Sequence, residues 1–158
     1  MKFSTKEDIE AQIDAVFDMV CDFESFESAA MRRGTEVQRM DNMQVAGVGM
    51  GWRAAFNMRG KRRQVEIEMI TFDKPNEIVL ECRSQGLITM MTLELVALSK
   101  TRTRLMISFD IKPLNLSARL LVQSLKLAKT SLTKKFKLRV ADFAKTVEDK
   151  HKEGSKLA

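Results

Sequence analysis

The C-terminal part of the chain places the strongest constraint on its fold. From Leu121 to Val147 the apolar residues recur at steps of three or four, which is the spacing of one face of an α-helix. No glycine or proline interrupts residues 116–152. The sequence therefore predicts one long helix over these residues, about 50 Å long at roughly 1.5 Å per residue. Its apolar face has to pack against the preceding part of the chain.

Two features qualify this predicted helix. Asn115 or Ser117 is expected to cap its first turn, because short polar side chains accept hydrogen bonds from the free amides there. Thr130, Ser131 and Thr133 are weak helix formers, so we expect any bend to fall among them.

The preceding part of the chain predicts a series of strands joined by short turns. In the clearest of them Trp52, Ala54, Phe56 and Met58 alternate with more polar residues, which is typical of a half-buried strand. The predicted strands are residues 2–9, 36–40, 52–58, 64–72, 78–84, 87–98 and 103–111. Two short helices, residues 14–23 and 26–33, follow the first strand. Short consecutive connections favour an antiparallel sheet, so the predicted fold class is α+β.

The residue types present exclude several kinds of chemistry. The chain has no tyrosine and one histidine, His151, near its C-terminus. Cys21 and Cys82 match no metal-binding spacing, so we expect reduced thiols in a cytoplasmic protein with no metal and no cofactor. The glycines of residues 47–51 precede a strand rather than a helix, which predicts a tight turn or a lid and not a dinucleotide site. We assign no catalytic residue.

The net charge of +6 is concentrated at the C-terminus. Residues 1–112 contain 16 Lys and Arg against 17 Asp and Glu, whereas residues 113–158 contain 11 against 4. A solvated helix face is the simplest interpretation. An anionic membrane surface is the alternative partner, contacted through Lys126, Lys129, Lys134, Lys135, Lys137 and Arg139. Nucleic acid is disfavoured because no aromatic residues for base stacking alternate with these side chains.

The order of elements, together with several short segments, resembles a known fold. The segments are residues 9–17, Asp22-Phe23, the glycine-rich residues 49–52 and the C-terminal helix. They resemble the helix-grip fold of the START and birch-pollen-allergen (Bet v 1, SRPBCC) superfamily, especially its polyketide cyclase/dehydrase-like branch. Gln12 stands where that family often has proline. The resemblance implies a single domain over residues 1–153, with about seven curved strands wrapped around the long helix, and a flexible tail over residues 154–158.

The resemblance also implies a function. Members of the superfamily mostly bind or carry hydrophobic molecules between the sheet and the C-terminal helix, so we expect a lipid, quinone or polyketide-like ligand. The expected lining residues are Phe26, Trp52, Phe56, Met58, Ile67, Met69, Met91, Leu93, Ile107, Leu121 and Leu125. The eleven methionines suit an adaptable lining, although a closed core would use them equally well.

Two alternative functions stay open at this stage. A cyclase or dehydratase would need a group inside the cavity that moves a proton, and without tyrosine or an internal histidine this role would fall to a carboxylate such as Glu94. We therefore lean away from an enzyme. The other alternative is an interaction protein that uses the basic C-terminal helix on a membrane surface or RNA.

Overall fold

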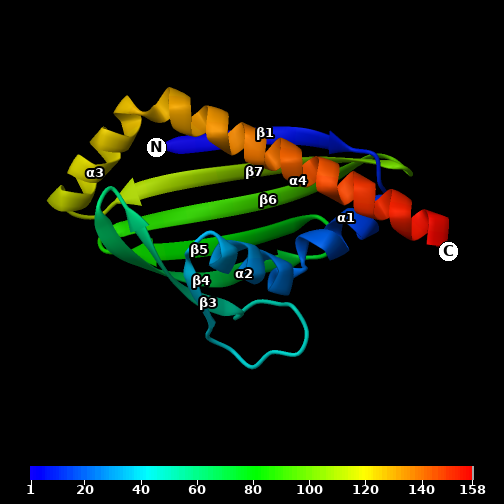
Figure 1. The fold of residues 1–158 in the computed structure, drawn as a ribbon, viewed down its shortest axis with the longest axis horizontal. Helices are drawn as coiled ribbons and strands as arrows, with labels where there is room; N and C mark the ends of the chain where they lie inside the picture. The colour runs from blue at the N-terminus through cyan, green and yellow to red at the C-terminus, as the bar shows by residue number, and fades with distance from the viewer. Residues whose placement is uncertain (158) are drawn as a thin grey trace.

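Seven strands and four helices make up the part of the chain that the structure describes, which in this computed structural model is residues 1–157, with side chains to residue 154 (Figure 1). The strands are β1 (Lys2–Ile9), β2 (Glu36–Arg39), β3 (Gly51–Met58), β4 (Lys61–Asp73), β5 (Glu77–Ser84), β6 (Leu87–Ser99) and β7 (Arg102–Pro113). The helices are α1 (Ile13–Val20), α2 (Phe23–Arg32), α3 (Leu116–Leu127) and α4 (Lys129–Leu157). The predicted tail, residues 154–158, falls mostly on residues whose side chains are not described.

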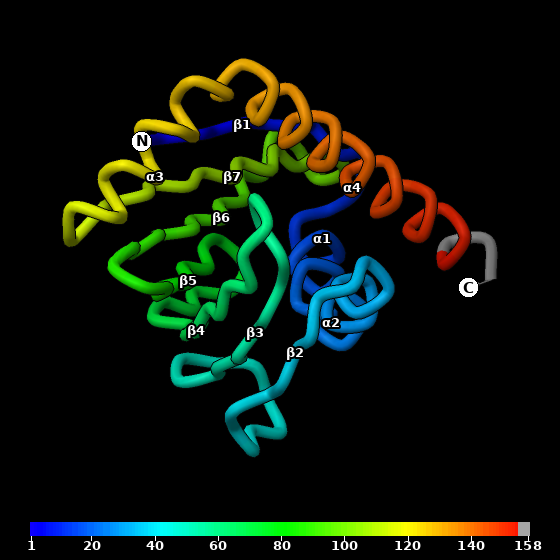
Figure 2. The backbone as a smooth tube through the Cα atoms, turned by 60° about the vertical axis from the view of Figure 1, so that its left-hand side comes forward, coloured from blue at the N-terminus to red at the C-terminus, as the bar shows by residue number. Residues whose placement is uncertain are grey.

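The strands form one antiparallel sheet in the order β1-β7-β6-β5-β4-β3-β2. Strands β2 to β7 follow one another along the chain, whereas β1 pairs with β7 at the opposite edge from β2. Helices α1 and α2 therefore carry the chain from one edge of the sheet to the other. Figure 2 shows α4 passing beside β1 and α2 lying beside β2, and both pairs are in contact. The predicted α+β helix-grip class is confirmed.

Two turns follow directly from local sequence. Arg59 and Gly60 have φ angles of 53° and 77°, and Met58 pairs with Lys61, so they form the tight β3–β4 hairpin that the sequence predicts. In the glycine-rich connection, Gly49 N–H donates to the Met69 carbonyl (3.0 Å) and Met69 N–H donates to the Met50 carbonyl (2.8 Å). This connection is therefore a turn hydrogen-bonded to β4, and strand β3 follows it.

The predicted C-terminal helix is divided into two. The chain leaves the helical conformation at Ala128, whose φ and ψ are −100° and 12° and whose N–H turns back to the carbonyls of Leu125 and Lys126. The break precedes the predicted bend, and residues 130–133 lie inside α4. Figure 1 shows the two helices at a steep angle. Helix α3 contacts β7, while α4 contacts β1.

The first turn of α3 is capped as the sequence predicts. The Asn115 side-chain oxygen accepts a hydrogen bond of 2.8 Å from Ala118 N–H. At the other end of the α3 segment, the Arg59 guanidinium on the β3–β4 hairpin donates to the Ser124 hydroxyl. These contacts hold α3 against the end of the sheet.

The tightest part of the core lies where α1, α4 and the β1–β7–β6 part of the sheet meet. Ile9, Phe17, Leu105 and Val147 are each at most 1% exposed there. Thr103 is also fully buried, and its hydroxyl donates a 2.8 Å hydrogen bond to the Ala11 carbonyl. Because this cluster closes one end of the inner face of the sheet, the remaining inner face is available for a site.

Candidate functional site

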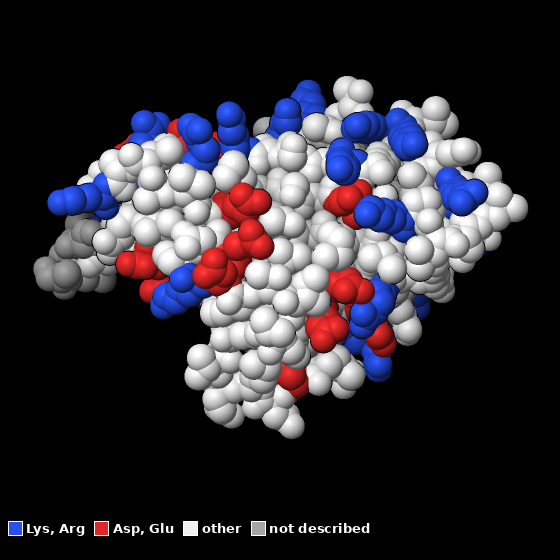
Figure 3. Space-filling model, turned by 180° about the vertical axis from the view of Figure 1, so that it is seen from behind, with Lys and Arg blue, Asp and Glu red and all other residues white. Residues whose placement is uncertain are grey.

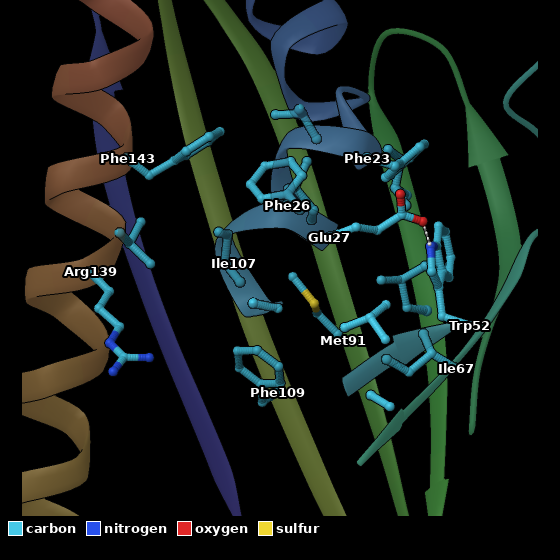
Figure 4. Close-up of a pocket in the computed structure, with 18 of the residues that line it drawn as sticks. Phe23, Phe26, Glu27, Trp52, Ile67, Met91, Ile107, Phe109, Arg139 and Phe143 are labelled. Carbon is cyan, nitrogen blue, oxygen red and sulfur yellow. Dashed lines mark hydrogen bonds between the residues drawn. The ribbon is translucent and has the colours of Figure 1, made fainter. Parts of the chain in front are cut away.

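A cavity of about 590 Å³ lies between the inner face of the sheet and helices α1, α2 and α4 (Figure 4). This volume is within the range of small-molecule sites in proteins. Apart from Glu27, Thr35 and Arg139, every lining residue is apolar. The apolar lining consists of Val20, Phe23, Phe26, Ala30, Val37, Trp52, Ala54, Ile67, Ile78, Leu80, Met91, Leu93, Ile107, Phe109, Phe136, Val140 and Phe143.

The alternation of the strands explains how the sheet supplies this wall. Lining residues occur in pairs two positions apart, as in Met91 and Leu93 on β6 and Ile107 and Phe109 on β7. Successive side chains of a strand point to opposite faces, so both members of each pair face the helices. The register places Met91 opposite Phe109 and Leu93 opposite Ile107, which makes the wall continuous across strands.

Aromatic pairs join the helices to one another and to the sheet around the cavity. The ring centroids of Phe26 on α2 and Phe143 on α4 are 5.6 Å apart. Those of Phe109 on β7 and Phe136 on α4 are 5.3 Å apart and nearly perpendicular. Such geometries are favourable for aromatic side chains. Helix α4 is therefore linked to both α2 and β7 at the border of the cavity.

A polar cluster anchors the α2 side of the wall. Trp52 Nε1–H donates to Glu27 Oε1 at 2.8 Å, and Arg39 Nη1 lies 3.9 Å from the same oxygen. The Arg39 guanidinium also lies over the Trp52 ring, 5.4 Å from its centroid. Arg39 in turn donates hydrogen bonds of 2.6 and 3.1 Å to Asp41. The charge of Glu27 is thus already partnered inside the protein.

Asp41 is held in its charged form. The Arg39 hydrogen bond is the main cause that lowers the pKa of Asp41 from 3.8 to about 2, and the hydrogen bond from the Gly51 amide adds to it. The amides of Met43 and Gly51 donate to this carboxylate at 3.0 and 2.9 Å. Asp41 therefore joins the β2–β3 connection to the polar cluster.

The sequence-predicted lining residues fall into two groups. Phe26, Trp52, Ile67, Met91, Leu93 and Ile107 line the cavity. The others lie elsewhere: Phe56 and Met58 continue β3 toward the hairpin, and Met69 is fully buried in the core. Leu121 and Leu125 lie on α3, outside the cavity lining, because the break at Ala128 turns that helix aside. Glu94 is exposed and is not part of the wall.

Sequence reasoning missed the two charged members of the cavity lining, Glu27 and Arg139. Glu27 follows Phe23 by four positions and precedes Ala30 by three, and both of these residues also line the cavity. Arg139 stands beside Val140 and between Phe136 and Phe143 on α4 in the same way. Helical spacing relative to apolar neighbours could have identified both residues.

Two cysteines are the remaining reactive side chains near the cavity wall and the core. Cys21 and Cys82 are free thiols, and burial is the main cause that raises the pKa of each to about 11, with help from nearby Asp18 and Glu81 respectively. Both thiols are therefore protonated near neutral pH. Among the described residues no group of three or more His, Cys, Asp and Glu side chains is placed to hold a metal ion.

The basic residues of the C-terminal region lie on the surface. Lys126 is on α3 and is exposed. The other five are on α4 and are also exposed: Lys129, Lys134, Lys135, Lys137 and Arg139. Figure 3 shows Lys and Arg side chains along the upper rim of the molecule, where these two helices lie. Within residues 1–157 no helix combines the length and the apolarity needed to cross a membrane.

Comparisons with known proteins support the fold assignment. No model of a protein family matches the chain. No curated protein matches it either. Solved structures do match. A point mutant of norcoclaurine synthase from Thalictrum flavum has a TM-score of 0.68 at 13% identity, covering 96% of each chain. The protein TTHA0849 from Thermus thermophilus has a TM-score of 0.67 at 13% identity, covering 93% of this chain and 97% of that one.

A third similar structure is the Zhui aromatase/cyclase from Streptomyces sp. R1128, with a TM-score of 0.63 at 12% identity over 96% of this chain and 93% of that one. At such low identity these similarities establish the fold alone. The chain has the START/Bet v 1-like helix-grip fold, of the kind seen in polyketide cyclases, as the sequence resemblance predicts. The chain thus combines this fold with an apolar cavity between the sheet and the helices.

Proposed function

We propose that the protein binds and carries a small hydrophobic ligand, such as a lipid, quinone or polyketide-like molecule, in the cavity between the sheet and α4. The observation that carries the proposal is the cavity, which has a volume of about 590 Å³ and is lined by apolar residues with three exceptions. Burial of an apolar ligand against such a wall is favourable because its surface leaves water. The proposal treats residues 1–153 as one binding domain. The two free thiols fit a reducing, cytoplasmic location.

Trp52 provides a direct test of this proposal. It is the only tryptophan in a chain without tyrosine, and it lines the cavity. A ligand that enters should therefore shift its fluorescence, and native mass spectrometry of freshly purified protein should reveal any lipid that is retained. Absence of bound lipid, together with no fluorescence or thermal shift across a lipid and quinone panel, would rule the carrier function out.

A cavity-filling variant sharpens the test. Ala54 lines the cavity from β3, so Ala54→Leu should occupy space that the ligand needs and weaken binding about tenfold or more. Ala97→Leu is the matched control, because Ala97 is exposed near the end of β6. Equal ligand affinity of the two variants would argue that binding occurs outside this cavity.

An enzymatic function is the less favoured interpretation. Norcoclaurine synthase and an aromatase/cyclase share the fold, but catalysis of their kind would need a group in the wall that can move a proton. The only lining carboxylate, Glu27, is engaged by Trp52 and lies near Arg39, while Glu94 lies outside. His151 stands near the far end of α4 and does not line the cavity.

A second proposal is that the protein docks on anionic membranes through α3 and the beginning of α4. Between Asp110 and Asp142 the sequence contains eight Lys and Arg and no Asp or Glu. On α3, Leu116, Leu120 and Leu127 are 72%, 59% and 92% exposed. Their spacings of four and seven residues place them on one helix face. An apolar face within a cationic surface suits the interface of an anionic bilayer.

Vesicle sedimentation tests the membrane proposal. We expect binding to vesicles that contain phosphatidylserine, weaker binding as salt is added, and a clear loss on combining Leu120→Ser with Leu127→Ser. The matched control is Ser117→Ala, an exposed position on the same helix that lies off the face of the three leucines. Equal binding to neutral vesicles, or binding insensitive to salt, would contradict the proposed electrostatic docking. Self-association through the leucines would appear instead as a dimer in sedimentation without vesicles.

A further inference from the structure

We infer that the cavity selects an amphiphile with an anionic headgroup, held at the cavity mouth by Arg139. The inference rests on the proposed carrier function and names the chemical class of its ligand. It is drawn from the position of Arg139, from the aromatic side chains on either side of it and from the distribution of charge around the cavity.

The mouth of the cavity can be located from exposure. Among all lining residues only Phe26 and Arg139 are exposed, whereas the others are buried or half-buried. The Phe26 ring packs at a tilt against Phe143, which stands one helical turn after Arg139 on α4. The two exposed residues thus lie on the two helices that meet at the α2–α4 border, and we place the mouth of the cavity at this border.

Arg139 lies between two aromatic bridges. Three positions before it, Phe136 contacts Phe109 on β7; four positions after it, Phe143 contacts Phe26 on α2. All three α4 residues belong to the cavity lining. Figure 4 shows the Arg139 side chain leaving α4 toward the cavity, on the side where Phe109 lies. A ligand passing between the bridges would meet the guanidinium.

The charge of Arg139 has no partner in the part of the protein described. No ion pair and no side-chain hydrogen bond involves it among residues 1–154. The other charged lining residue, Glu27, is already engaged by Trp52 and lies near Arg39. Arg139 is thus the lining group that remains free to bind an opposite charge.

These features together define the ligand class. A carboxylate or phosphate can accept two parallel hydrogen bonds from a guanidinium, which is the strongest polar contact the mouth offers. The apolar wall behind it would cover an alkyl or polyketide chain. Glu27, the other charged lining residue, is a carboxylate and offers no attraction to an anionic headgroup, so the headgroup should bind at Arg139. A long-chain carboxylate is the simplest molecule of this kind.

Four probes with the same dodecyl chain test the inference. Trp52 fluorescence would be titrated with dodecanoate, dodecyl phosphate, dodecanol and dodecylammonium. For the unmodified protein we expect both anions to bind about tenfold more tightly than dodecanol, and dodecylammonium to bind most weakly. The ratio of dodecanoate to dodecyl phosphate distinguishes a fatty-acid from a phospholipid-like headgroup.

Two variants assign the effect to Arg139. Arg139→Gln should remove the tenfold preference for the anions and leave the affinity for dodecanol unchanged, which also shows that the variant is folded. Lys137→Gln is the matched control: it removes the same charge from an exposed α4 position that does not line the cavity, and it should keep the preference.

The outcomes separate this inference from the proposed function. Equal affinities for dodecanoate and dodecanol, or an anion preference that survives Arg139→Gln, would overturn the inference and leave the carrier function standing. Failure of all four probes, with no lipid retained on purification, would count against the carrier function itself.

Discussion

Trp52 and Glu27 are joined by a hydrogen bond of 2.8 Å from the indole N–H to the carboxylate, which connects β3 to α2 across the edge of the cavity. Helix α2 contains no fully buried residue, so its attachment to the sheet depends on contacts of this kind. Phe23 supports the same junction, with its ring centroid 5.3 Å from that of Trp52. One hydrogen bond and one aromatic contact therefore join α2 to Trp52 of β3 on this side of the cavity.

Trp52→Phe is expected to loosen α2 without emptying the wall. The substitution keeps an aromatic ring but removes the donor to Glu27, which should lower the free energy of unfolding by about 1–3 kcal/mol. Denaturant unfolding followed by circular dichroism measures the loss. Relative to the unmodified protein, amide hydrogen exchange should increase more in α2 than in β6. Glu24→Gln, an exposed change on the same helix, is the control. Unchanged exchange in α2 would contradict the proposed role of the bond.

Thr103→Val is expected to destabilise the protein through a single lost hydrogen bond. The Thr103 hydroxyl is fully buried and donates to the Ala11 carbonyl at 2.8 Å. Valine has nearly the same shape but leaves that carbonyl without its donor, at a cost of about 1–3 kcal/mol. Urea unfolding should show this loss, whereas the exposed Thr101→Val should change stability by less than about 0.5 kcal/mol. Similar losses in both variants would indicate a general effect of valine.

Asp41 makes the β2–β3 connection sensitive to acid. Its pKa is lowered from 3.8 to about 2 in the folded protein, chiefly by the hydrogen bond from Arg39. A lowered pKa means that its stabilising effect is complete above pH 3.8 and is lost as the pH falls through about 2. The protection of the Gly51 and Met43 amides against hydrogen exchange, relative to an unfolded chain at the same pH, should therefore fall over this range. In Asp41→Asn this protection should already be low at neutral pH and should not depend on pH in this way.

Gln12→Pro should stabilise the start of α1. Gln12 is the N-cap residue, with a φ of −68° and no side-chain capping bond, and its backbone angle already matches the one that proline imposes. The Gln12 N–H donates no hydrogen bond within the described residues. Proline should therefore raise the free energy of unfolding by about 0.4–1 kcal/mol, mainly by restricting the unfolded chain. A lower melting temperature for Gln12→Pro would show that the turn before α1 needs more freedom than this angle indicates.

Much of the sheet could be predicted because its signals are local. The alternation of Trp52 and Ala54 with polar neighbours is visible in the sequence, and the structure places both on the cavity wall. The hairpin at Arg59-Gly60 depends on two residues with positive φ, and glycine adopts such angles at no steric cost. Strand and turn propensities of this kind act within a few residues.

The division between α3 and α4 could not be predicted in this way. The apolar spacing runs through Ala128 without interruption, and no glycine or proline marks the break. Because the chain turns at Ala128, α3 and α4 run in different directions, with α3 against β7 and α4 against β1 (Figure 1). For the same reason Leu121 and Leu125 have the right spacing for the cavity wall and yet lie outside it.

The sequence by itself determined the strands, their order and the apolar face that each presents, because these depend on periodicity over a few residues. Only the tertiary structure decided that these faces leave a cavity between them, and that Glu27 is partnered there while Arg139, among the described residues, is not. The physical reason is that a cavity and its polar groups depend on the relative placement of elements distant in sequence. A pattern along one helix, even the long C-terminal one, does not contain that placement.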